Sequence, residues 1–487
     1  MKKATLLLAL PLLAMCACTN DEPNEDLDQS VTVPDEGGTP DYDPDQIPEF
    51  DYSIAAYDGT KASDAVSYPV GNPDLNPNEN TWDNIVTVTY NGATATVTGA
   101  SEAGVTASIV GANVDLALGG SKQVKIIATG TSDCGSLRLT GSYKHLLELD
   151  NLTLTATDRP AINDQIKKRV FVVLKGHNSL ADGARYNVTA EQRKGCFFAE
   201  DHIVLCGDGV LEIRGNYRHG LVTDGFLFVN AGATLAVTDA AKNAIHVKGS
   251  GVNNQYRGIE IVGGYVYANT SAPAGKAMRC DGNIRLRGGK FSLNCSGDAA
   301  IDPDDGLLSS AGCIKSDGGV YISGGDLKLC ATGKGGKGIT ADYDIEISGG
   351  DLSLAVSGDA TSADGDSSVP KGLNAHGNLN IIGGGVNVSA IGAGSTALGA
   401  DNNLTVNGGV TYAFGRTNGV KAMTAEVAGG VFICGGMVNT AAAGATKSTY
   451  GALEADEVTV IKDDAGSVLG GFRWPVAMTT ASLLYRF

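Results

Sequence analysis

The sequence is poor in several kinds of residue, and each shortage excludes a class of protein. Aromatic residues make up 6% of the chain, with two tryptophans, so a broad aromatic platform for stacking ligands is not expected. Proline accounts for only 14 of 487 residues, which argues against a disordered Pro/Gly-rich chain. The six histidines do not cluster at zinc-ligand spacing, and no G-x-S-x-G nucleophile elbow occurs. The sequence therefore gives no sign of a zinc enzyme or a serine hydrolase.

Basic residues are also scarce, and they are missing altogether from one stretch near the N-terminus. The formal net charge is −18, which argues against a nucleic-acid partner because phosphate binding needs clustered lysines and arginines. Between Thr19 and Thr60 the chain has thirteen acidic residues and no Lys or Arg. A solvated acidic segment accounts for most of the charge imbalance.

The N-terminus has the pattern of an export signal. Met1–Ala17 contains two lysines, an apolar run too short to span a bilayer, and small residues at its end. The residues around Cys18 resemble a lipobox, so we expect cleavage and lipid attachment at Cys18; ordinary cleavage without lipid is the alternative. The acidic residues after Cys18 resemble a signal for the outer face of the outer membrane. The sequence thus predicts a signal peptide over residues 1–17 and an acidic flexible tether over residues 18–50.

A repeated phrase runs through the body of the chain. It consists of a short alternating strand, Gly-Gly, a second strand, a polar corner and an Asp-containing turn, as in VYISGGDLKLCA (320–331) and IEISGGDLSLAV (345–356). Successive Gly-Gly pairs begin at 263, 288, 324, 349, 384 and 408, which gives steps of 25, 36, 25, 35 and 24 residues. The longer steps fit one repeat plus an insertion. This periodicity indicates stacked units whose strands pair in parallel.

Stacked repeats of this kind predict an all-β fold, a right-handed parallel β-helix of about 10–12 coils with β caps at both ends. The alternation places Ile345, Ile347, Leu352 and Leu354 in the interior, and each Gly-Gly pair marks a sharp corner. Caps are expected because open strand edges promote aggregation. The predicted parts are an N-terminal β cap (51–135), the parallel β-helix (136–440) and a C-terminal cap (441–487).

Two segments resemble a known family. KGCFFAEDHIVLCGDGVLEIRGNYRHGLVTDG (194–225) and AAKNAIHVKG (240–249) are similar to the secreted bacterial carbohydrate-binding β-helix proteins related to calcium-dependent pectate lyases. The resemblance covers about residues 85–440 and implies a polysaccharide-binding surface protein that often carries calcium. The chain departs from the family where relatives have acidic pairs in the turns, because it has Arg218-His219 and Lys242-Asn243 there.

Acidic residues suggest where calcium could bind. Insertions enter at one corner of the repeat over 183–194, 298–311 and 359–370, and the last two are acidic. Ca²⁺ takes six to eight oxygen ligands, which flexible Asp/Gly/Ser loops can supply. A solvated acidic loop, and ordinary turn chemistry for the column of aspartates, are the alternatives. The candidate calcium ligands are Asp298, Asp302, Asp304, Asp305 and Asp317.

Basic residues form a second set of columns. Lys276, Lys337 and Lys371 precede the same corner of successive repeats, and Arg279 and Lys315 lie three residues farther along. On one face these side chains could hold the carboxylates of an acidic glycan, and Tyr343 could stack on a sugar ring. Internal charge pairing between the basic and acidic columns is the alternative.

These observations lead to three hypotheses of function. The first is a non-catalytic cell-surface lipoprotein that binds polysaccharide with the help of calcium, favours plant-type or acidic glycans, and acts as a monomer. The alternatives are a calcium-dependent polysaccharide lyase and an adhesin or structural surface protein. The eight cysteines after Cys18 do not coincide between repeats, so we expect most of them to be buried as small apolar residues.

Overall fold

The computed structural model describes residues 47–487, except 120–121, 188, 192, 250–257 and 304–305. The predicted signal peptide, the lipid attachment at Cys18 and most of the predicted tether lie outside the described residues, so they stay predictions. In the described part of the chain, no helix has the length and hydropathy needed to cross a membrane. The helix given among the described residues is a short 3-10 helix, η2 (Pro77–Glu79).

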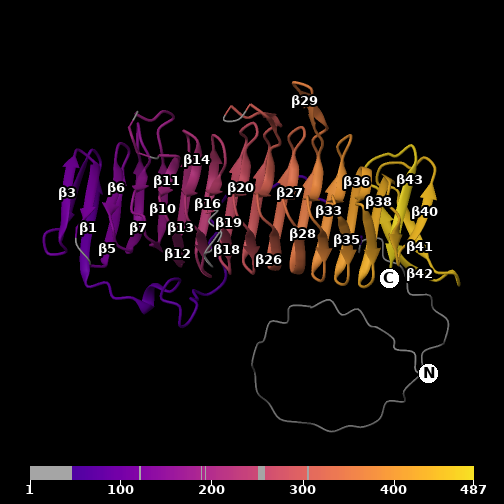
Figure 1. The fold of residues 1–487 in the computed structure, drawn as a ribbon, viewed down its shortest axis with the longest axis horizontal. Helices are drawn as coiled ribbons and strands as arrows, with labels where there is room; N and C mark the ends of the chain where they lie inside the picture. The colour runs from indigo at the N-terminus through magenta and orange to yellow at the C-terminus, as the bar shows by residue number, and fades with distance from the viewer. Residues whose placement is uncertain (1–46, 120–121, 188, 192, 250–257, 304–305) are drawn as a thin grey trace, which may run out of the picture. The chain divides into compact units, whose positions relative to one another are not determined.

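The described strands pair mainly in three parallel ladders, because each strand bonds to the equivalent strand of the next repeat. Figure 1 shows these strands side by side in a row, with hairpins and loops leaving at one edge. Ladder 1 consists of β1 (Asn84–Asn91), β5 (Val124–Ser132), β7 (His145–Thr155), β9 (Val170–Lys175), β12 (Ile203–Gly207), β15 (Leu227–Val229), β18 (Ile259–Ile261), β21 (Ile284–Leu286), β26 (Val320–Ala331), β28 (Ile345–Val356), β32 (Leu379–Ile381), β35 (Asn403–Val406), β37 (Thr424–Val427) and β39 (Ala442–Ala443).

Ladder 2 shares the long strands β5, β7, β26 and β28 with ladder 1, because each of them bends around a corner. The further strands of ladder 2 are β10 (His177–Ala181), β13 (Val210–Gly215), β16 (Thr234–Ala240), β19 (Tyr265–Thr270), β22 (Lys290–Cys295), β33 (Gly385–Ala390), β36 (Val410–Lys421) and β38 (Val431–Val438). Ladder 3 consists of β4 (Asn113–Leu118), β6 (Ser136–Gly141), β8 (Ile162–Asp164), β11 (Gly195–Ala199), β14 (His219–Thr223), β17 (Ile245–Val247), β20 (Lys276–Cys280), β25 (Gly312–Ser316), β27 (Lys337–Ala341), β31 (Lys371–Ala375), β34 (Thr396–Ala400) and the end of β36.

The remaining strands are antiparallel. Four of them pair onto the ends of the main sheet: β2 (Thr94–Thr98), β3 (Val105–Val110), β40 (Thr446–Tyr450) and β43 (Ala481–Arg486). Three separate hairpins are β23 (Ala300–Ile301) with β24 (Leu308–Ser309), β29 (Thr361–Ala363) with β30 (Asp366–Ser368), and β41 (Val458–Lys462) with β42 (Val468–Arg473).

The pairing corrects the predicted fold. The all-β class is right, but the right-handed parallel β-helix of about 10–12 coils with separate β caps is not what forms. The ladders close into a barrel-like wall, and two of them have twelve parallel strands with antiparallel outer strands at their ends. The physical reason is that apolar and polar residues alternate in the end strands as they do in the others. Val86, Leu116 and Leu484 therefore all enter the same apolar core. End strands that share this core are part of the wall and not caps upon it.

One apolar core lies inside the wall. Ile345, Ile347 and Leu354 are fully buried and Leu352 is 2% exposed, so the predicted inward set is confirmed. Of the eight cysteines after Cys18, all free, seven are buried and Cys134 is half-buried. Apolar side chains from neighbouring repeats therefore stack in continuous rows, which is how short repeats gain a core that none has alone.

One glycine of each Gly-Gly pair, the second in five of the six pairs and Gly384 in the remaining one, takes a conformation that other residues avoid. Gly350 has φ +82°, and a Cβ atom there would lie 2.7 Å from the carbonyl oxygen of Gly325 in the preceding repeat. Positive φ and this close approach both require glycine. The Gly-Gly corner is therefore set by backbone stacking, as the sequence predicts.

A segment before the first strand crosses the outside of the wall. Asp51 pairs with Lys328, the hydroxyls of Tyr52 and Ser389 lie 2.6 Å apart, and Tyr57 packs against the rings of Tyr265 and Tyr267. Farther along, Trp82 packs against Phe171. These contacts are made with ladders 1 and 2, so the segment covers those faces.

Candidate functional site

Two adjoining pockets, called here the basic pockets, lie on ladder 3. The Lys337 pocket has a volume of about 240 Å³ and the His246 pocket about 220 Å³, and both are lined by Lys276 and Arg279. Together their lining contains seven lysines and arginines against three aspartates, in a protein whose net charge is −18. The charged lining residues are Arg218, Lys242, Lys248, Lys276, Arg279, Lys315, Lys337, Asp281, Asp302 and Asp342.

Two of the predicted insertions form the walls of the Lys337 pocket. Ser309 and Ser310 come from the β23–β24 hairpin and the residues after it, and Ser367 and Ser368 come from β30 of the second hairpin. The ammonium group of Lys276 donates a hydrogen bond to the hydroxyl of Ser309 at 2.7 Å. The insertions therefore add hydroxyl groups beside the basic residues of the ladder.

The strand register brings the predicted basic residues together. Lys276 pairs with Gly312, Gly312 with Lys337 and Lys337 with Lys371, while Arg279 pairs with Lys315. Neighbouring strands lie about 4.8 Å apart, so these side chains form two short columns on one face. Lys371 continues its column beside Lys337, although it does not line either basic pocket.

One of these columns is neutralised by aspartates. Arg279 lies 3.4 Å from Asp281 and 3.1 Å from Asp317, and Lys315 lies 2.9 Å from Asp317 and 2.6 Å from Asp342. Each cation thus bridges two carboxylates of adjacent repeats. Here the alternative of internal charge pairing is right, and these pairs also keep the two basic side chains in place.

The other column has no carboxylate partners among the described residues. Lys276 is 5% exposed and bonds to the carbonyl oxygen of Ala274 at 2.8 Å as well as to Ser309. Lys371 donates to the amide oxygen of Asn374 at 2.6 Å. The ammonium group of Lys337 has no hydrogen-bond or ion-pair partner in the described part of the chain. Burial, with nearby positive charge, lowers the pKa of both Lys276 and Lys337 to about 8.

Two buried histidines, not expected from the sequence, line the His246 pocket. The backbone N–H of Asn243 donates to Nδ1 of His219 at 3.1 Å, so the proton of His219 is on Nε2, 3.4 Å from Nδ1 of His246. Nε2 of His246 then lies 3.5 Å from Asp281. Burial lowers the pKa of both histidines. Aligning the repeats could have identified them, because His219 occupies the position of Lys276 in an earlier repeat and His246 occupies that of Arg279.

The two histidines predict a fall in stability at acid pH. Their pKa is depressed in the folded protein, so below about pH 6.5 the unfolded chain binds more protons and the free energy of unfolding decreases. Arg218, Lys242 and Arg279 around them oppose protonation, whereas Asp281 favours it.

The melting temperature of wild type should therefore drop more between pH 7.5 and 5.5 than that of His246→Gln. Burial raises the pKa of Asp182 to about 6, so this residue stabilises the folded protein as the pH falls. Wild type and His246→Gln both contain Asp182, so its effect cancels when their melting temperatures are compared. The exposed His177→Gln serves as a control and should keep the wild-type drop. An equal drop in His246→Gln and wild type would contradict the assignment.

The candidate calcium ligands do not converge in the part of the chain that the structure describes. Asp298 accepts the backbone N–H of Lys334 at 2.8 Å, Asp302 pairs with Lys242 at 3.0 Å, and Asp317 pairs with Arg279 and Lys315. No group of three or more His, Cys, Asp or Glu side chains able to hold a metal occurs among the described residues. The described aspartates therefore do not form a calcium site by themselves. Asp304 and Asp305 lie outside the described residues, so the calcium site stays a prediction.

Tyr343 lies apart from the basic pockets. Its side chain is 67% exposed at the turn after β27, and it lines neither pocket. The sequence predicts Tyr343 as a sugar contact because it lies near a turn, and its neighbour Asp342 does line the Lys337 pocket. Stacking of Tyr343 on a sugar stays a prediction.

Comparison with known proteins places the chain in context. The family model described as carbohydrate-binding domain-containing protein matches residues 111–301 and 255–419, which together cover more than half of the chain. No curated protein matches. A solved structure, "Structure of the polysaccharide lyase-like protein from C. thermocellum, Gadolinium derivative", is similar at 17% identity over 61% of this chain and 96% of that chain. Its TM-score is 0.34, and a similarity at this level carries no argument.

Proposed function

The chain belongs to the family of carbohydrate-binding domain-containing proteins, and on this premise we propose that it binds an acidic polysaccharide in the basic pockets without cleaving it. The carboxylate or sulfate groups of the glycan contact the column of Lys276 and Lys337. Arg279 and Lys315, held by aspartates, line the pocket beside them. The protein in this proposal is a binding module and not an enzyme.

The observation that carries the proposal is the position of Lys337. Its ammonium group lies largely buried in a pocket, near Lys315, Lys371 and Asp342, and none of the described carboxylates forms an ion pair with it. A buried charge without a partner destabilises a fold, so such a residue is most readily explained by a partner that arrives with the ligand. An anion supplies that partner.

The hydroxyl groups around Lys337 support a sugar over a simple anion. Ser309, Ser310, Ser367 and Thr340 line the same pocket as the lysines. A sugar acid presents ring hydroxyls close to its charged group, so it needs hydrogen-bond donors and acceptors next to cations. The pocket offers this mixture.

The proposal is tested by titrating the protein with three glycans at low salt: polygalacturonate, dextran sulfate and neutral dextran. We expect binding of at least one polyanion, weakening as salt is raised, and no binding of dextran. Preference between the first two distinguishes carboxylate from sulfate recognition. Failure to bind either polyanion, or equal binding of dextran, would overturn the proposal. Release of unsaturated uronides from polygalacturonate, followed by ultraviolet absorbance, would overturn its non-catalytic part.

A further inference from the structure

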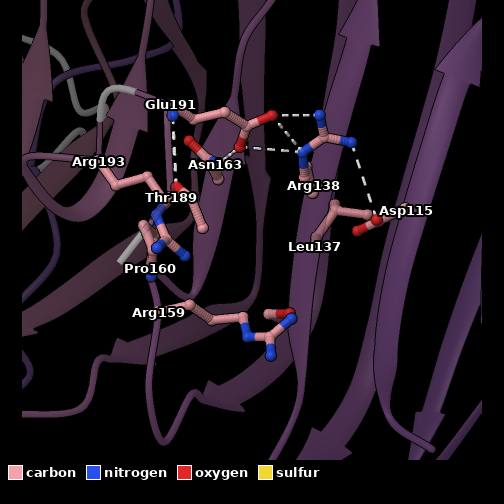
Figure 2. Close-up of a pocket in the computed structure, with 10 residues that line it drawn as sticks. Asp115, Leu137, Arg138, Arg159, Pro160, Asn163, Thr189, Glu191 and Arg193 are labelled. Carbon is pink, nitrogen blue, oxygen red and sulfur yellow. Dashed lines mark hydrogen bonds and ion pairs between the residues drawn. The ribbon is translucent and has the colours of Figure 1, made fainter. Parts of the chain in front are cut away.

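A third pocket on ladder 3 lies several strands before the basic pockets. This Arg159 pocket has a volume of about 320 Å³ and lies beside the remaining insertion, 183–194. Figure 2 shows Arg138 and Glu191 facing each other on one side of it, with Arg159 extending from the opposite side. The lining residues that carry charge are Asp115, Arg138, Arg159, Glu191 and Arg193.

The three arginines of this pocket are not equivalent. Nε of Arg138 donates to both carboxylate oxygens of Glu191 at 2.9 and 3.1 Å, and the same arginine forms an ion pair with Asp115 at 3.7 Å, so two carboxylates balance its charge. Arg159 bonds to Asp158 through Nε alone, at 2.7 Å. Its two terminal nitrogens have no partner among the described residues, and they are the donors with which guanidinium groups bind carboxylates or sulfates.

Arg193, which belongs to the insertion 183–194, provides a second cationic group in the lining of this pocket. One of its terminal nitrogens donates to the carbonyl oxygen of Asn187, and its guanidinium carbon lies 5.8 Å from the ring centre of Tyr186. Tyr186 in turn stacks on Tyr217 at 4.0 Å between ring centres, and Tyr217 is 42% exposed. The pocket thus combines two guanidinium groups with an adjacent aromatic pair, which suits an acidic sugar residue.

The order of strands places this pocket in line with the basic pockets. Asn163 on β8 lines the Arg159 pocket, His219 and His246 on β14 and β17 line the next one, and Lys337 on β27 lines the last. Seven strand-to-strand steps, or about 34 Å at about 4.8 Å each, separate β6 from β27. The successive strands are β6, β8, β11, β14, β17, β20, β25 and β27.

We propose that the Arg159 pocket is a further subsite for the same polyanionic glycan, which lies lengthwise along ladder 3 and occupies this pocket and the basic pockets at once. This inference rests on the proposed function and adds to it a direction and a second contact point. Binding at one pocket makes binding at the other intramolecular, so affinity increases steeply once the glycan is long enough to span both. A trisaccharide is shorter than this span and gains nothing from the second pocket.

The test compares polygalacturonate and trigalacturonate, titrated by calorimetry onto wild type and onto Arg159→Gln/Arg193→Gln. The double variant should bind the polymer at least about tenfold more weakly, and it should bind the trisaccharide at the basic pockets with the affinity of wild type. Arg214→Gln, an exposed arginine on β13 of ladder 2, is the matched control and should bind both ligands as wild type does. Melting temperatures near that of wild type check that the variants are folded.

The outcomes separate this inference from the proposed function. If wild type binds neither polygalacturonate nor dextran sulfate, the proposed function fails. If wild type binds polygalacturonate and the folded double variant binds it equally well, the proposed function stands and the lengthwise subsite is wrong. If wild type binds the polymer no more tightly than the trisaccharide, with both affinities expressed per binding site, the lengthwise subsite is wrong as well.

Discussion

Lys337→Met should weaken binding of the acidic glycan by about 10- to 100-fold. The substitution keeps the length and apolar stem of the side chain but removes the ammonium group. A hydrogen bond to a charged group contributes about 1.5–3 kcal/mol, and every 1.4 kcal/mol is tenfold in affinity. Calorimetric titration with the polyanion that wild type binds better measures the loss. Lys334→Met is the control, because Lys334 is an exposed lysine three residues away, and it should bind as wild type does.

The same variant should be more stable than wild type in the absence of glycan. Burial lowers the pKa of Lys337 from 10.5 to about 8, so at pH 7 the folded protein holds this charge at a cost of about 1–3 kcal/mol. The cost decreases as pH rises from 8 towards 10.5, where the folded protein loses the proton before the unfolded chain does. A higher melting temperature together with weaker binding is the result that an internal structural role cannot give. Unchanged affinity in a folded Lys337→Met would contradict the site.

Leu352→Ala should lower the free energy of unfolding by about 2–5 kcal/mol. Leu352 is 2% exposed and stacks between Leu327 and Val386 of the neighbouring strands, so truncation leaves a cavity that the rigid wall cannot fill. Urea denaturation followed by circular dichroism measures the change.

Ser353→Ala is the matched control for Leu352→Ala, because the next side chain along a strand points to the opposite face. Ser353 is half-buried on the outer face, and its truncation should change stability by no more than about 0.5 kcal/mol. If Ser353→Ala is the more damaging of the two, the assignment of inner and outer faces is wrong by one residue.

Much of the repeat could be predicted from the sequence because its physical causes are local. Alternation of Ile and Leu selects the inner face, and the positive φ of residues such as Gly350 explains why Gly recurs at each corner. Closure of the ladders into one wall was not predictable in the same way. It depends on whether the outermost strands share the core or merely cover it, and alternating residues such as Val86 and Leu116 are compatible with either.

The sequence predicts which basic residues of the candidate site lie in one column, but not which of them form ion pairs. A repeat fixes which positions lie about 4.8 Å apart, so the column of Lys276, Lys337 and Lys371 followed from alignment alone. Whether a long side chain turns toward an aspartate or into a pocket depends on the insertions around it, and these do not repeat. Arg279 therefore proved to be paired and Lys337 unpaired, although the sequence treats them alike. The Arg159 pocket was not predicted because Arg193 comes from an insertion and Arg159 from an irregular turn, and neither position repeats.

The central claim is that the ammonium group of Lys337 pairs with an anionic group of a glycan, and its own titration tests this most directly. Lysine side-chain signals are followed by NMR over a range of pH, and the Lys337 signal is assigned by its absence from Lys337→Met. Without glycan the pKa should be about 8. With saturating polygalacturonate or dextran sulfate, whichever binds, the pKa should rise toward the ordinary value of about 10.4, because a nearby anion favours the charged form. A pKa that stays the same in the saturated complex would contradict the account.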